Sequence, residues 1–227
     1  SHISRLDVCK QLFGAYINRL VSYDLPKKVG LITFGANVQD KAKPTSFFDM
    51  FRSKIDNVEG DGDTHLFDAI MVASKNLVEW RDMIMKKRKD SDMKHVLPKL
   101  RIVVLSDGQD EGSSVNTMTV GMELQKYGIV LDSIQVGTSN EDLIAITHAS
   151  KGLVYVPKNI VDMYSICESD TMLCGHQRTE PNFYVPKLRA YNHSELRALG
   201  QRRVYTNYTE RQKVPDQLKL EVVPLGE

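Results

Sequence analysis

The chain has 227 residues, of which 41% are hydrophobic and 26% are charged, and both values are ordinary for a globular protein. Its 30 basic and 29 acidic side chains leave a net charge of +1, which removes the general electrostatic basis for binding nucleic acid. No stretch approaches the roughly 18 consecutive apolar residues that a membrane-spanning helix requires, so we expect no membrane insertion.

Helical and strand patterns alternate along the first two thirds of the chain. Helices are predicted where apolar residues recur at steps of three and four, and strands where a short apolar run stands between turn residues. The elements follow in the order helix 3–21, strand 29–35, helix 47–55, helix 64–85, strand 100–105, helix 115–127, strand 129–136, helix 141–149 and strand 153–156. Gly128 is the expected cap at the end of one helix, and Asn140 the expected cap at the start of the next.

Continuously apolar strands separated by amphipathic helices predict a mainly parallel sheet with helices on both faces, a doubly wound α/β fold. We expect this domain to cover residues 1–166. Residues 167–227 differ in composition, with prolines between polar stretches and a net charge of +5 over 178–213. We interpret them as a C-terminal extension or linker, with a basic surface for an acidic ligand as the alternative.

Two polar residues stand where this fold places its ligands, beyond the carboxyl ends of the strands. Asp107 follows an apolar strand in Val-Leu-Ser-Asp-Gly, and Thr64 opens a long helix in Gly-Asp-Thr-His. A carboxylate and a hydroxyl at neighbouring loops suit a hard divalent cation such as Mg²⁺. The spacing alone is equally compatible with a helix cap at Thr64 and a turn residue at Asp107.

At these residues the chain resembles the von Willebrand factor A family, which has the integrin I-like fold. The matching pieces, which cover about residues 3–166 in the right order, are Gly62-Asp63-Thr64, Leu66 to Ile70, Val103 to Gly108, Glu123 to Gly137 and Leu143 to Val156. The resemblance implies a metal-ion-dependent adhesion site (MIDAS), which holds a cation by an Asp-x-Ser-x-Ser loop, a threonine and an aspartate. Thr64 and Asp107 match the last two positions, and Ser1 is the candidate for the loop's final serine.

The family's first strand and most of its Asp-x-Ser-x-Ser loop have no counterpart in the sequence. That strand is central in the family, and its neighbours would bury unpaired backbone groups without it. We therefore expect a strand from elsewhere: upstream residues of a longer native chain, the alternating segment Leu218–Val223, or a partner.

Function follows from the resemblance as an expectation. We expect a non-enzymatic protein-interaction module of a larger intracellular protein, which binds an acidic side chain of a protein partner through Mg²⁺ if the complete protein contains the missing front loop. The alternative is a metal-free assembly domain inside a multidomain enzyme or complex, for example one that is ubiquitin-related. Three cysteines, an odd and sparse set, fit reduced thiols and a cytoplasmic location. The spacing of Cys167, Cys174 and His176 is no standard zinc pattern.

Overall fold

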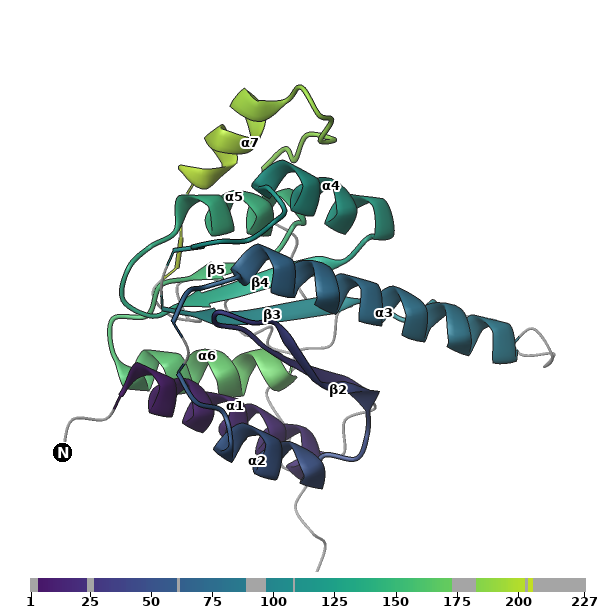
Figure 1. Cartoon of the computed structure of the whole chain (residues 1–227), viewed down its shortest axis with the longest axis vertical. Helices are drawn as coiled ribbons and strands as arrows, with labels where there is room; N and C mark the ends of the chain where they lie inside the picture. The colour runs from purple at the N-terminus through teal and green to yellow at the C-terminus, as the bar shows by residue number, and fades with distance from the viewer. Residues whose placement is uncertain are drawn as a thin grey trace, which may run out of the picture.

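A computed structural model describes residues 4–23, 27–60, 62–88, 97–107, 109–172, 183–202 and 204–205. Helices and strands alternate as the sequence predicts (Figure 1). The elements are α1 Arg5–Ser22, β1 Val29–Thr33, β2 Gln39–Thr45, α2 Asp49–Asp56, α3 Leu66–Arg88, β3 Arg101–Ser106, α4 Thr117–Tyr127, β4 Val130–Gln135, α5 Glu141–Ala149, β5 Val154–Tyr155, α6 Ile160–Met172 and α7 His193–Gly200. None of the described helices is long and apolar enough to cross a membrane.

The parallel sheet has the order β3-β4-β5. β3 and β4 pair in register from Arg101 opposite Val130 to Ser106 opposite Gln135, and each lies within one residue of the predicted strand bounds. The expected doubly wound α/β fold is therefore confirmed. The two expected caps are also present: the Asn140 side chain accepts the Leu143 N–H at 2.9 Å, and Gly128 has φ of 65°.

An antiparallel pair, β1 and β2, forms a second, separate sheet. The polar sequence of β2, Gln-Asp-Lys-Ala-Lys-Pro-Thr, gave no strand signal, because only Ala42 is buried in it. A strand with one neighbour tolerates Pro44, which has no N–H to donate. Within the described residues, no strand is hydrogen-bonded between this pair and the parallel sheet. The expected additional strand would lie there, while its candidate segment 218–223 is outside the described residues.

Helices on each face span both sheets. α3 contacts β1, β2 and β3 on one face. On the other face, Leu12 of α1 packs with Ile134 of β4, while Leu20 of the same helix packs with Leu31 of β1. Apolar side chains above and below therefore connect the two sheets, and Figure 1 shows the resulting layers.

The segment that follows α6 returns to the opposite face of the sheet and packs on α4 and α5 (Figure 1). Both ends of the Gln125 side-chain amide, in α4, are hydrogen-bonded to this segment: Nε2 donates to the Pro186 carbonyl at 2.9 Å, and Oε1 accepts the Leu188 N–H at 2.8 Å. Buried Leu196 and Leu199 of α7 join the main core. Residues 183–202 are thus integral to the packing, and position 166 lies inside α6.

Candidate functional site

Three loops lie together at one edge of the molecule: the loop after β1, the loop after β3 and the segment that carries Thr64. The Thr64 segment lies between the other two loops and is hydrogen-bonded to both. The Glu111 N–H, in the loop after β3, donates to the Thr64 carbonyl at 2.8 Å. On the other side, the His65 N–H donates to the Gly35 carbonyl, just after β1, at 3.1 Å. The Thr64 segment therefore joins the two sheets by backbone hydrogen bonds.

The loop after β3 also holds the start of α3. The first N–H groups of a helix have no partner inside the helix. In α3, the Phe67 N–H donates to the Asp110 carboxylate at 3.1 Å and to Ser113 Oγ at 3.0 Å, and the Asp68 N–H donates to Ser113 Oγ at 3.2 Å. Caps come here from residues more than 40 positions away, and Thr64, which precedes the helix, is not its cap.

Asp68 binds the same loop in the opposite direction. Its carboxylate accepts the Ser114 N–H at 3.0 Å, the Ser114 hydroxyl at 2.9 Å and the Val115 N–H at 3.2 Å. Partial burial raises the pKa of Asp68, but these hydrogen bonds and the neighbouring His65 outweigh it and hold the pKa below its ordinary value. The carboxylate is therefore charged at neutral pH and fixes the loop after β3 against α3.

The side chain of His65 limits the space for a side chain at position 112, at the tip of this loop. Gly112 has φ of 109°, a conformation that side chains rarely adopt, and a Cβ there would lie 3.0 Å from His65 Nε2. His65 Nδ1 lies 3.5 Å from the Asp68 carboxylate. The ring of His65 is half-buried and precedes α3.

Asp107, one of the predicted ligands, is exposed at the end of β3 and lies close to the first turns of α1. Burial, together with the negative charge of Asp107, raises the pKa of the Cys9 thiol to about 11. α1 begins at the same edge, where Ser4 and Asp7 form a capping box. Thr64, Asp107 and the start of α1 therefore share one end of the sheet, while Ser1 lies outside the described residues.

The metal ligands available in this region are few. In the part of the chain that the structure describes, no group of three or more His, Cys, Asp or Glu side chains could hold a metal ion. The hydroxyl of Thr64 and the carboxylate of Asp107 are oxygen donors of the kind that a hard cation takes. Cys167 is buried, and the rest of its sequence cluster, Cys174 and His176, lies outside the described residues.

Sequence reasoning missed the roles of Asp110 and Ser113. Asp110 and Ser113 are close in sequence, three positions apart, but the N–H groups they accept belong to Phe67 and Asp68. No local pattern identifies such a cap, because both residues are also ordinary in turns.

A family model for the von Willebrand factor type A domain matches residues 8–165. The chain belongs to this family. VWA domains are protein-interaction modules and are generally not catalytic. The expected family is therefore confirmed, and so is the coarser functional expectation of an interaction module.

A curated relative of this VWA domain is much longer than the chain. A protein of Acanthamoeba polyphaga mimivirus named "Probable bifunctional E2/E3 enzyme" is 31% identical over 179 residues, which cover 78% of this chain and 13% of the viral protein. The chain thus spans about an eighth of that relative's length.

Solved structures of two other proteins share the VWA fold. A von Willebrand factor type A protein from Catenulispora acidiphila has a TM-score of 0.55 at 12% identity, over 73% of this chain and 37% of that one. Proximal thread matrix protein 1 from the mussel byssus has a TM-score of 0.55 at 18% identity, over 74% of this chain and 40% of that one. A second structure of the mussel protein, with a TM-score of 0.50 at 17% identity over 72% and 39% of the chains, is described as having a zinc-occupied MIDAS motif.

Proposed function

We propose that this VWA domain binds an acidic side chain of a protein partner through a divalent cation held by Thr64 and Asp107. The observation that supports it most is the hydrogen bonding of the loops: Glu111, four residues after Asp107, donates its N–H to the Thr64 carbonyl. This bond ties the threonine segment to the loop that begins with the aspartate. The two predicted ligands therefore belong to one connected structure at the carboxyl end of the sheet.

The donors fit a magnesium ion that keeps part of its water shell. Magnesium prefers oxygen ligands and is commonly held by only one or two carboxylates plus water, and Ser1 is the proposed third protein ligand. The surface around the site is acidic, with Asp63, Asp107 and Glu111 all exposed. A bound cation would offset this charge, without which an acidic partner would be repelled.

Calorimetric titration with MgCl₂ tests the metal site. We expect saturable binding to the 227-residue chain that is lost in Asp107→Asn and weakened in Thr64→Val, which removes the hydroxyl at constant shape. Glu111→Gln is the matched control, since it removes one exposed charge from the same loop and should change the affinity less than twofold. If Asp107→Asn and Glu111→Gln weaken magnesium binding equally, the binding reflects general electrostatic attraction and not coordination by Asp107.

A second candidate function comes from the viral relative. We propose that a longer protein containing this domain is an enzyme of the E2/E3 type, ubiquitin-related and cytoplasmic, in which the domain recruits or positions a partner. Of the two cysteines that the structure describes, Cys9 has a raised pKa and Cys167 is buried, so neither is suited to act as a nucleophile. Absence of magnesium binding, with partner binding retained, would favour this metal-free assembly function.

A further inference from the structure

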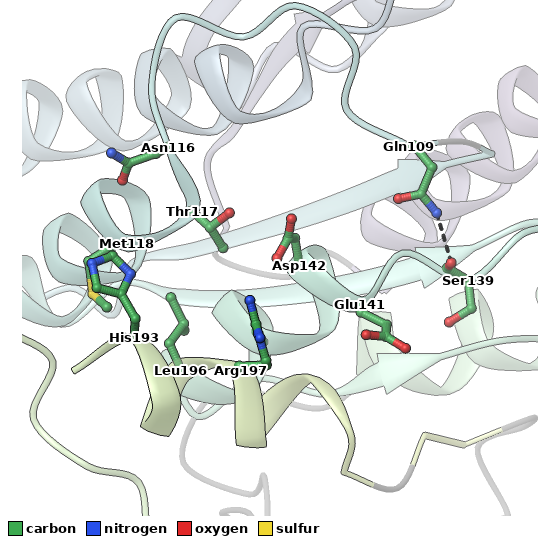
Figure 2. Close-up of a pocket in the computed structure, with 11 residues that line it drawn as sticks. Gln109, Asn116, Thr117, Met118, Ser139, Glu141, Asp142, His193, Leu196 and Arg197 are labelled. Carbon is green, nitrogen blue, oxygen red and sulfur yellow. Dashed lines mark hydrogen bonds between the residues drawn. The ribbon is translucent and has the colours of Figure 1, made fainter. Parts of the chain in front are cut away.

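A groove of about 820 Å³ lies between α7 and the N-terminal turns of α4 and α5 (Figure 2). Its floor is apolar and buried, and is formed by Met118, Ala145 and Leu196. Its rim is polar and exposed. At one end the loops after β3 and β4 are tied together, because Gln109 Nε2 donates to the Ser139 carbonyl at 2.9 Å.

The wall formed by α7 is held firmly in place. At Gly200 a Cβ would lie 2.8 Å from the Glu141 carbonyl, so the end of α7 packs directly on the first turn of α5. The ring of His148 in α5 donates from Nδ1 to the Leu199 carbonyl at 2.9 Å. Since α7 lies beyond residues 8–165, which match the VWA model, this groove depends on a part of the chain outside the family domain.

The two walls carry opposite charge. α5 contributes the carboxylates of Glu141 and Asp142, and α7 contributes His193 and Arg197, which are four positions apart on one helical face. Figure 2 shows Asp142 and Arg197 projecting from neighbouring helices, with no hydrogen bond between them. Across the described residues, neither Glu141 nor Asp142 has an ion pair, and neither does Arg197.

The position of these charges at helix ends accounts for only part of the arrangement. Carboxylates stabilise the first turn of α5 and Arg197 stabilises the last turn of α7 through the helix dipoles. Neither effect requires these charges to line a common groove. The unpaired charges on both walls therefore leave complementary groups available to a ligand that carries both signs.

We propose that this groove binds an extended segment of a partner protein in which basic and acidic residues alternate. In an extended chain, successive side chains point to opposite sides. Basic side chains would then face Glu141 and Asp142, while acidic ones face Arg197 and His193. The exposed rim suits a chain that passes through the groove, and a volume of about 820 Å³ lies within the range of ligand sites.

Fluorescence anisotropy with two labelled hexapeptides tests this proposal on the 227-residue chain. One peptide is Lys-Glu-Lys-Glu-Lys-Glu, and the other is its isomer Lys-Lys-Lys-Glu-Glu-Glu, which has the same composition and net charge. We expect saturable binding of the alternating peptide and about fivefold weaker binding of the isomer. A change in affinity of this size corresponds to the loss of one or two exposed ion pairs. Equal affinities, or no saturable binding of the alternating peptide up to about 1 mM, would overturn the proposal.

Variants assign the binding to the two walls. Arg197→Gln, and separately the pair Glu141→Gln with Asp142→Asn, should each weaken the alternating peptide about fivefold. Glu195→Gln is the matched control, because it removes a charge from exposed α7 surface outside the groove and should leave the affinity within twofold. If the control has the same effect as the groove variants, the proposal fails. A dimer of this chain that Arg197→Gln dissociates would assign the groove to a second copy and would also overturn it.

Discussion

Leu199 of α7 is a buried member of the main core, and its truncation tests whether the C-terminal segment belongs to the fold. The side chain is 2% exposed within the main core. Leu199→Ala removes three carbon atoms, which costs about 2.4 kcal/mol at about 0.8 kcal/mol per buried methylene, and the remaining cavity raises the loss to about 3 kcal/mol. In a chain of this size that corresponds to a fall in Tm of about 6–12 °C.

Urea denaturation followed by circular dichroism measures this loss on the 227-residue chain. Leu97→Ala is the matched control, because the same atoms are removed from a side chain that is 62% exposed, and we expect it to change the free energy of unfolding by less than about 0.5 kcal/mol. Equal stability of the two variants would refute the placement of α7 in the core. So would a separate early transition in which α7 unfolds while the sheet stays intact.

Three further predictions follow from the described contacts. Burial lowers the pKa of His148, with Arg202 adding to the effect and the bond to Leu199 opposing it, so the folded state binds the proton more weakly than the unfolded chain. This histidine's stabilising contribution should be complete above pH about 6.5 and decline as the pH falls below it, and His148→Gln should flatten that slope in urea titrations across pH. Gly152→Ala should destabilise by about 3 kcal/mol or more, because its Cβ would lie 1.6 Å from the Leu131 carbonyl; a change below about 1 kcal/mol would contradict this geometry. Alkylation of Cys9, followed by peptide mass mapping, should be slow at neutral pH and faster in Asp107→Asn, and unchanged rates would show that the two groups are not coupled.

The apolar strands were predictable because burial on both faces leaves a signal in the sequence itself. β3 contains the apolar run Ile102–Leu105, β4 is buried from Leu131 to Gln135 although three of its residues are polar, and their parallel pairing follows from the helix between them. β2 has only one neighbour and one buried residue, so its sequence resembles a loop. α6 was missed although a signal existed: Asn159 stands three positions before Asp162 and accepts its N–H at 2.9 Å.

The position of the candidate site was predictable from the sequence, but the contacts that build it were not. Thr64 and Asp107 stand out because each borders a predicted element at the ligand-binding edge of the fold. The cap of α3 joins Asp110 to a residue 43 positions away, and the hydrogen bonds of Gln125 join residues 61 or more positions apart. Such contacts depend on tertiary structure, and short-range sequence patterns carry no trace of them.

The two backbone bonds of the Thr64 segment have a consequence for long-range communication. Within the described residues, one bond links it to the antiparallel pair through Gly35, and the other links it to the parallel sheet through Glu111. A ligand held by both Thr64 and Asp107 would therefore also fix the spacing between the two sheets. A partner that docks on a distant face of α1 or α3 and changes this spacing would therefore change the affinity of the site for its ligand. By thermodynamic reciprocity, the ligand would change the affinity of that partner by the same factor.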